Sequence, residues 1–314
     1  MVIELTGPRH LWREMRKELL LMLLISCLAY YFHHHVYSFE LDIPEGALGI
    51  FGLAITVFII FRTNKVYERW WEARIIWGQI VNDSRTWAMK VMALINSDTA
   101  HKRINDRQVT VVQKELIHLH LVFINALRIY LRRQEDWNEL AHYLAPDELE
   151  HLLRITNKPT QLIHKQAQRL EEFFAKGVES GRYKVELLNL LRSLYDDQGK
   201  CERIKNTPFP KHYTFLTDIT VWCYAAMICV YLVSQFHIVL KADMDILTIP
   251  LATAVGTIIV GLERLAKFHE DPFDMEIHST PMSTLCRSIE IDLREQLGES
   301  TALQPLEPEH GVLR

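Results

Sequence analysis

The apolar residues of this chain are gathered into four blocks without a charged side chain, at residues 19–32, 46–61, 219–236 and 246–262. An α-helix rises about 1.5 Å per residue, so a helix of about 20 residues crosses the hydrocarbon core of a bilayer. The first block needs its flanks or a tilt to reach that length, whereas the other three come close to it. The pattern predicts four transmembrane helices in two hairpins, with spans at about 19–37, 44–62, 216–237 and 246–264.

The long middle region between the two hairpins has the pattern of soluble helices. Leu116, His120, Phe123 and Leu127 recur at helical spacing, and the leucines within 187–194 do so again. Clear strand alternation is missing. We therefore expect an all-α protein in four segments: an N-terminal segment with the first hairpin over 1–62, a cytosolic helical domain over 63–213, a second hairpin over 214–265, and a C-terminal helix and tail over 266–314.

Basic residues near the ends of the blocks predict the orientation, because lysine and arginine in short loops tend to remain in the cytoplasm. Such residues precede the first and third blocks and follow the second and fourth, whereas the loop at 33–45 has none and the last loop has only Lys241. Both termini and the middle region are therefore expected in the cytoplasm. A basic stretch before an apolar block is also typical of a signal peptide, but three histidines stand where a cleavage site would be, which favours an uncleaved span.

Composition narrows the classes of function. The net charge is −4, so there is no broad basic surface for a nucleic acid. The 5 cysteines are scattered without a C-x-x-C pair and are expected to be reduced packing residues. The middle region has no glycine-rich phosphate loop, no H-E-x-x-H motif and no paired carboxylates, so we predict that the protein is not an enzyme.

Three segments carry a more specific signal: FRTNKVYERWWEARIIWGQIVNDSR at 61–85, CERI followed by TPFP within 201–210, and EDPFDMEIHSTPMSTLCRSIEIDL at 270–293. Together with the order of the blocks they resemble the bestrophin family, in particular its bacterial homologues, over about residues 8–293. The resemblance implies a homopentameric ion channel in the lipid bilayer, here a bacterial inner membrane. It also implies that the second spans surround the axis, with a narrow apolar neck and a wider cytosolic vestibule.

Alignment on the Arg-Trp-Trp at 69–71 places the family's pore neck at Leu53, Val57 and Phe61. Residues four apart lie on one face of a helix, so these three form a stripe. Apolar rings offer no ligand to replace the water around an ion, so such a neck closes by dewetting and widens to conduct. Apolar residues on a membrane helix also simply face lipid. A second stripe is equally periodic: Ile50, Ala54 and Phe58.

Two other features of the pore are less specific. The family has a second constriction at the cytosolic exit, which falls near Arg182 or Tyr183 where a small aliphatic residue is usual. At the outer mouth, acids would favour cations if they faced the axis, and near a helix start they also act as caps. These acids are Glu40, Asp42 and Glu45.

Animal members of the family hold calcium with a run of acids after the last span. The matching acids here are Glu270, Asp271, Asp274 and Glu276. Pro272 and Phe273 interrupt the run, and calcium needs six or more oxygen ligands. We therefore expect a structural turn with a helix cap, no calcium gating and no cofactor.

The resemblance leaves the permeant ion open, because animal bestrophins resemble anion channels whereas some bacterial relatives favour monovalent cations. The expected partners are small inorganic ions, with chloride or other monovalent anions first, further copies of the chain and the lipid bilayer. Two alternatives remain. One is a channel selective for monovalent cations, and the other is a non-conducting scaffold whose membrane helices only anchor its cytosolic helices.

Overall fold

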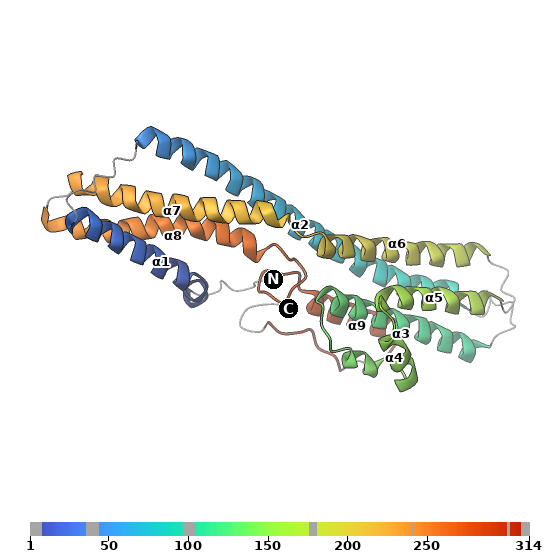
Figure 1. Ribbon diagram of the computed structural model, residues 1–314. Coiled ribbons are helices and arrows are strands. Elements are labelled where there is room, and N and C mark those ends of the chain that lie inside the picture. Colours follow the sequence, from blue (N-terminus) through green and yellow to red (C-terminus); the bar gives the residue numbers. More distant parts are fainter. Residues whose placement is uncertain are drawn as a thin grey trace. The chain divides into compact units, whose positions relative to one another are not determined.

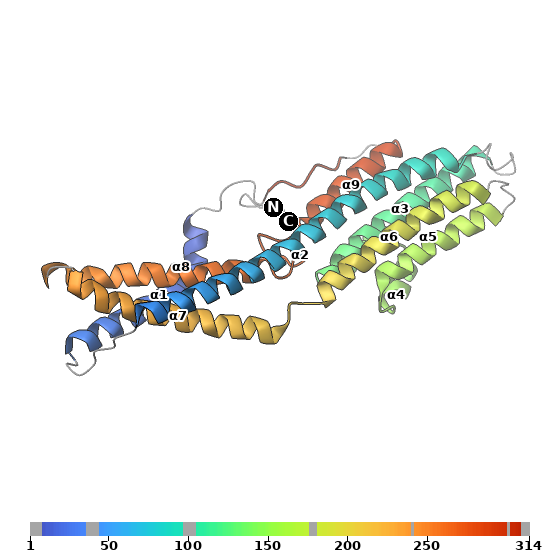
Figure 2. The same cartoon turned by 90° about the horizontal axis from the view of Figure 1, so that it is seen from above.

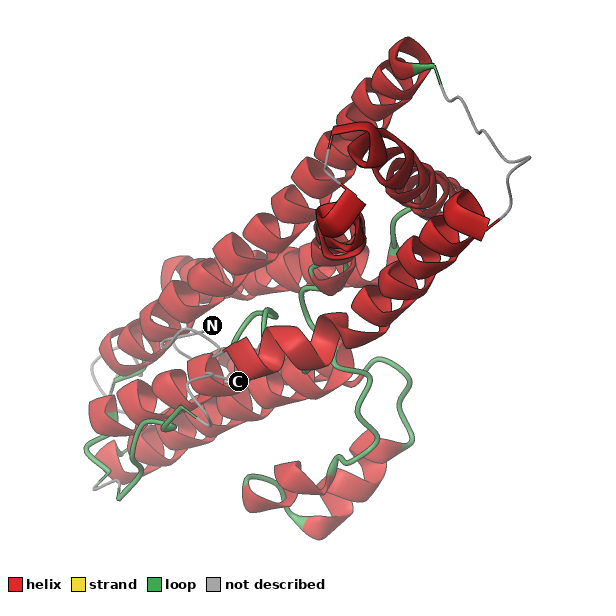
Figure 3. Cartoon of the chain, turned by 90° about the vertical axis from the view of Figure 1, so that its left-hand side faces the viewer, coloured by secondary structure: helices red, strands yellow, loops and turns green. Residues whose placement is uncertain are grey.

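A computed structural model describes residues 8–35, 44–96, 105–175, 181–239, 242–299 and 302–308 of the chain. Every regular element in these ranges is a helix, as Figure 3 shows, so the predicted all-α class is confirmed for this part of the chain. The elements are α1 (Pro8–His35), α2 (Glu45–Leu94), α3 (Asp106–Leu131), η1 (Asn138–His142), α4 (Pro146–Leu153), α5 (Lys158–Ala175), α6 (Gly181–Asn206), α7 (Lys211–Val239), η2 (Ala242–Leu247), α8 (Thr248–Phe268) and α9 (Met282–Gln296).

Among the described helices, three segments are long and apolar enough to cross a membrane: Glu45–Leu94, Lys211–Gln235 and Asp245–Phe268. These segments overlap the second, third and fourth predicted spans almost completely. The first predicted span also lies in a helix, α1, but its uncharged part is confined to the stretch between Glu18 and three consecutive histidines. Length and composition therefore support three spans, and the fourth stays a prediction.

The chain divides into two compact units. The apolar unit comprises Glu4–Trp70 and Pro208–Glu270, and the bundle unit comprises Met1–Ile3, Trp71–Thr207 and Asp271–Arg314. The domain boundaries drawn from the sequence fell at 62/63, 213/214 and 265/266, whereas the compact units divide a few residues away from each. The difference arises because packing inside the chain, and not hydropathy, defines a compact unit.

In the apolar unit, α1, α7 and α8 pack against one another, and α7 and α8 run side by side in Figures 1 and 2. Glycine permits one of these close approaches. A Cβ atom added at Gly256 of α8 would lie 2.7 Å from Cys229 Sγ of α7 and 2.9 Å from Met22 Sδ of α1. Small residues at such crossings bring helix backbones together in membrane proteins. The buried core of this unit consists of Met22, Ile55, Val221, Ala225, Cys229, Val233, Ala252 and Val260.

In the bundle unit, α3 is the central helix and packs against α5, α6 and α9. It begins with a capping box, in which Asn105 and Gln108 each accept the other's backbone N–H. His120 lies fully buried on α3, with Nε2 3.0 Å from Ser84 Oγ. Burial lowers the pKa of His120 to about 3, against a smaller opposing effect of a hydrogen bond with Gln166. The ring is therefore neutral and part of the core.

Candidate functional site

The three residues predicted to form the pore neck lie on an exposed face of α2. Leu53, Val57 and Phe61 expose 70%, 45% and 61% of their surface. The buried positions of α2 within the apolar unit are Leu48, Ile55, Arg62 and Val66. With about 100° of rotation per residue, the centre of the stripe lies about 165° from the centre of this buried face. The stripe therefore points away from the rest of the apolar unit.

The competing stripe on α2 is also exposed but lies closer to the buried face. The centre of the stripe formed by Ile50, Ala54 and Phe58 lies about 105° from the centre of the buried face. Its Phe58 ring lies 6.1 Å, centroid to centroid, from the Tyr213 ring of α7, which is within the range of an aromatic contact. This geometry separates two stripes that the sequence left equivalent. The assignment of Leu53, Val57 and Phe61 as a pore neck stays a prediction.

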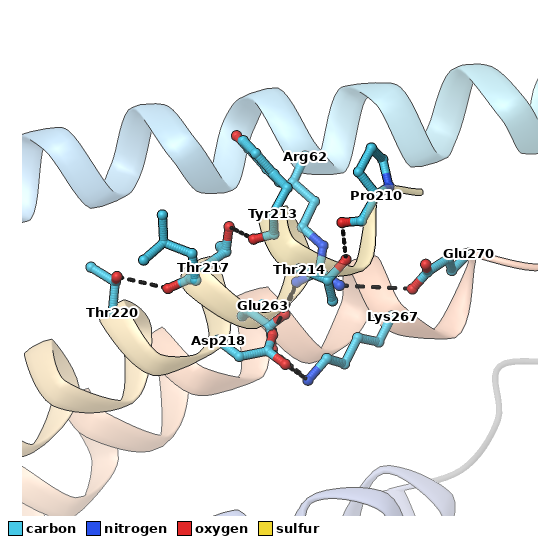
Figure 4. Close-up of polar contacts among 11 residues, drawn as sticks. Arg62, Pro210, Tyr213, Thr214, Thr217, Asp218, Thr220, Glu263, Lys267 and Glu270 are labelled. Atoms are coloured by element: carbon cyan, nitrogen blue, oxygen red, sulfur yellow. Dashed lines mark hydrogen bonds and ion pairs between the residues drawn. The ribbon is translucent and has the colours of Figure 1, made fainter. Parts of the chain in front are cut away.

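Arg62, the residue after Phe61, is almost completely buried, with 1% of its surface exposed. Figure 4 shows its guanidinium group directed at carboxylates of α7 and α8. Its Nη1 lies 3.1 Å from Asp218 Oδ1 and also pairs with Glu263, which is itself buried. A buried charge is costly unless it is paired. The ion pairs with these carboxylates therefore keep the Arg62 face of α2 packed against α7 and α8.

Two further charges complete this buried cluster, as Figure 4 shows. Lys267 Nζ lies 2.6 Å from Asp218 Oδ2 and 3.7 Å from Glu263 Oε2. Glu270 Oε2 lies 3.8 Å from Arg62 Nη2. Because Arg62 and the stripe occupy opposite faces of α2, a rotation of the helix that moved the stripe would also break the pairs of Arg62. The cluster thus fixes which face of α2 is exposed.

The sequence did not identify this cluster, because Arg62 was assigned only as a basic residue flanking the second span. A signal was nevertheless present. Glu263 directly follows the last apolar block and Asp218 directly precedes the third, and ionisable residues at such positions usually have a partner. The partner could not be named, because Arg62 is separated from Asp218 by 156 positions and from Glu263 by 201.

Of the three acids predicted at the outer mouth, Glu40 and Asp42 lie outside the described residues. Glu45 opens α2, where an acid in the first turn interacts favourably with the helix dipole. Glu45 is exposed, and its role in selectivity stays a prediction.

The two residues proposed for a cytosolic constriction lie in the first turn of α6, in the bundle unit. Arg182 and Tyr183 are both exposed. Arg182 contributes, after the larger effect of Lys90, to lowering the pKa of the Glu186 carboxyl. The described residues of the bundle unit leave these side chains uncovered, and their role at a pore exit stays a prediction.

The acids matched to the animal calcium site form a turn. Asp271 Oδ2 lies 2.5 Å from Lys205 Nζ, and Asp271 Oδ1 accepts the backbone N–H of Phe273 at 3.1 Å. Asp274 Oδ1 accepts the backbone N–H of Glu276 at 2.9 Å, and burial raises the pKa of the Asp274 carboxyl. These donors occupy oxygens that a calcium ion would need. The set does not fit calcium in this geometry, and the absence of calcium gating stays a prediction.

The long apolar helices, the crowded helix crossings and the buried charge cluster at the ends of α7 and α8 define a helical membrane protein. The family model of the Bacterial/Fungal Bestrophin protein matches residues 9–295, and the chain belongs to this family. The predicted resemblance is thereby confirmed.

Curated relatives and solved structures agree with this membership. The voltage-dependent anion channel-forming protein YneE of Escherichia coli K12 is 29% identical over 251 residues, which cover 80% of this chain and 76% of the relative. A protein of the same description from Mesorhizobium japonicum is 28% identical over 267 residues, covering 83% and 79%. A crystal structure of a bacterial Bestrophin homolog from Klebsiella pneumoniae superimposes with a TM-score of 0.77 at 21% identity, covering 90% of this chain and 98% of that one. The structural match shows the bestrophin fold.

Proposed function

We propose that this protein is an anion channel that passes chloride or other small monovalent anions through the membrane. The relatives described as voltage-dependent anion channel-forming proteins support an anion as the permeant ion. The observation that carries the pore assignment is the position of Leu53, Val57 and Phe61. They form an exposed apolar stripe opposite the buried face of α2.

The channel we propose is a homopentamer in a bacterial inner membrane, with α1 as the fourth span and both termini in the cytoplasm. Five copies of α2 would surround the axis and direct their stripes toward it. This arrangement removes the exposed stripe from lipid, because the five stripes face one another around the axis. The buried cluster around Arg62 would hold every copy of α2 in the same rotation, so that the three rings are formed together.

The three apolar rings would gate the pore by controlling whether water fills the neck. An ion in a narrow apolar constriction loses hydration and gains no ligand in return, so a neck of this kind is closed when it is dry and conducts when it widens. Such a ring discriminates weakly between ions of opposite charge. Selectivity for anions would then be set by charged and polar groups outside the neck. No catalytic step is part of this proposal.

The first test is the reversal potential of the purified protein in planar bilayers under a KCl gradient, followed by substitution of sodium or of a larger anion. We expect a reversal potential near the chloride equilibrium potential. A value near the potassium potential would replace the anion channel with a cation channel. The absence of current from a verified oligomer would favour a membrane-anchored scaffold.

The neck is tested with a matched pair of aromatic residues on α2. Phe61→Ala and Phe58→Ala remove the same side chain from the two competing stripes, where 61% and 47% of the residue is exposed. We expect Phe61→Ala and Val57→Ala to raise the current several-fold by widening the constriction, while Phe58→Ala leaves it close to wild type. Equal currents from the two phenylalanine variants would show that the stripe was assigned incorrectly.

A further inference from the structure

The bundle unit contains a polar cavity of about 330 Å³, formed by none of the residues of the α2 stripe. It lies between α3, η1 and α9, and its ionisable lining includes Arg128, Glu139, His142, Arg287 and Glu290. Cys286 also lines the cavity, and burial raises the pKa of its thiol to about 12, so this sulfur is neutral. The volume is at the small end of the range of about 300–1,000 Å³ found for ligand pockets.

The carboxylates that line the cavity already form ion pairs with arginines. Arg128 Nη2 pairs with Glu139, and Arg294 Nη2 lies 2.9 Å from Glu290 Oε1. Arg287 lines the same cavity and pairs with no carboxylate among the described residues. One guanidinium group in the lining, that of Arg287, is therefore left without a carboxylate partner among the described residues.

Two further groups in the lining have unused hydrogen-bonding capacity. Arg128 is 7% exposed, and its Nε–H has no acceptor among the described residues. A buried donor of a charged group without an acceptor is costly. The Ser283 hydroxyl accepts a hydrogen bond from Arg132 Nη1 at 2.7 Å, which leaves its own proton free to be donated. Both groups would be satisfied by an oxygen atom with negative charge.

We propose that this cavity binds a small anion that bears a carboxylate or phosphate group, held by Arg287 and Arg128 with Ser283 as a hydroxyl donor. The planar guanidinium fork matches both of these oxyanions with two parallel hydrogen bonds. Such a ligand would join α9 to α3 and η1 within the bundle unit. The site is separate from the ion pathway proposed on α2 and does not depend on that proposal.

The test uses the full-length chain in nanodiscs of phosphatidylcholine, so that no anionic lipid competes. Inorganic phosphate and succinate are titrated separately at constant ionic strength, with binding followed by isothermal titration calorimetry. We expect saturable binding of at least one of the two, and the comparison distinguishes phosphate from carboxylate chemistry. If neither probe binds to the wild-type chain, the proposal fails.

Three variants locate the binding. Arg287→Gln should raise the dissociation constant at least tenfold, because it removes the unpaired cation. Arg192→Gln is the matched control, since it removes an exposed arginine of α6 from the same unit and should change the constant less than twofold. Glu139→Gln should tighten binding several-fold, because it releases Arg128 from its partner.

The variants also keep the test informative if one of them folds poorly. Glu139→Gln alters a residue whose side chain is 48% exposed, so we expect the fold to tolerate it. Binding that Arg287→Gln leaves as tight as in wild type would place the anion elsewhere, for example in the pore, and would overturn the proposal. Weaker binding by Glu139→Gln would overturn it as well.

Discussion

The apolar part of α2 and the helix α3 are both rich in apolar residues, yet the chain buries them to very different extents. Only 17% of the most apolar window of α2 is buried within the chain. Along α3, by contrast, nearly every residue from Leu116 to Leu131 is buried. The apolar surface of α3 is covered by its own bundle, whereas that of α2 needs lipid or other copies of the chain. We therefore expect an exposed apolar helix in this protein to contact lipid or another copy of the chain.

Buried polar groups distinguish the units in a second way. The apolar unit buries Arg62 and Glu263 as partners in an ion cluster. The bundle unit buries His120 as a neutral ring, because no carboxylate faces it and burial disfavours its charged form. Arg62 therefore keeps its charge by pairing and His120 avoids the charge, although the bundle unit also buries a paired charge in Arg128 with Glu139.

The largest effect is expected from Arg62→Ala, which leaves Glu263 buried without its main partner. Removing one member of a buried ion pair typically costs about 3–5 kcal/mol. We expect a loss of that size in the free energy of unfolding, measured by urea titration in detergent micelles with tryptophan fluorescence. Lys65→Ala is the control, because it removes an exposed cation from the next turn of α2 and should cost less than about 1 kcal/mol. Equal effects of the two would show that Arg62 is not held as described.

A pair of leucines measures the difference between α2 and α3 directly. Leu116→Ala removes a fully buried side chain and should lower the free energy of unfolding by about 2–5 kcal/mol. Leu53→Ala removes the same atoms from an exposed position and should cost less than about 0.5 kcal/mol in a dissociated chain. Chemical unfolding of both variants in monomer-forming detergent makes the comparison. A large loss for Leu53→Ala would mean that the chain itself covers the stripe.

The neutral His120 predicts a dependence of stability on pH. Its folded pKa of about 3 lies below the ordinary value of 6.5, so only the unfolded chain binds the proton between these values. The contribution of His120 to the free energy of unfolding is therefore fully present above pH 6.5. The free energy of unfolding falls by about 1.4 kcal/mol for each pH unit below 6.5. His120→Gln should flatten this slope in unfolding curves recorded from pH 7 to pH 5. His118→Gln is the control, because it removes a partly exposed histidine from the same helix and should change the slope less.

The smallest effect is expected at a charge pair on the surface. Arg203 of α6 pairs with Glu72 of α2, and their side chains are 62% and 45% exposed. Exposed pairs contribute about 0.2–1 kcal/mol and are screened by salt. A double-mutant cycle with Arg203→Ala and Glu72→Ala should give a coupling energy in that range at low salt and almost none in 1 M NaCl. A coupling energy as large as the loss expected for Arg62→Ala would show that exposed and buried charge pairs contribute equally to stability.

Much of this fold was predictable from local pattern. The four apolar blocks and the periodic leucines identified the helices, because each helix is specified by its own residues. The full length of α2 was not predicted. Arg62 ends the apolar block, but no proline follows before Leu94, so the helix continues while its pattern changes from apolar to amphipathic.

The candidate site was predictable only in part. The resemblance selected Leu53, Val57 and Phe61, but period alone could not separate them from Ile50, Ala54 and Phe58. The separation required knowledge of which face of α2 is buried, and that depends on α7 and α8. Arg287 was not singled out at all. An arginine on a polar helix lines a cavity only when other elements fold against it, here η1 and α3.

The buried arginine also constrains the order in which the protein can be assembled. An arginine within a membrane span costs about 2.5–3.5 kcal/mol during insertion. The carboxylates that pair with Arg62 lie 156 and 201 positions further along the chain. At about 5–20 residues per second, Glu263 is synthesised on the order of ten seconds or more after Arg62. We therefore expect Arg62 to stay solvated until α7 and α8 have been made, and its burial to accompany their packing against α2.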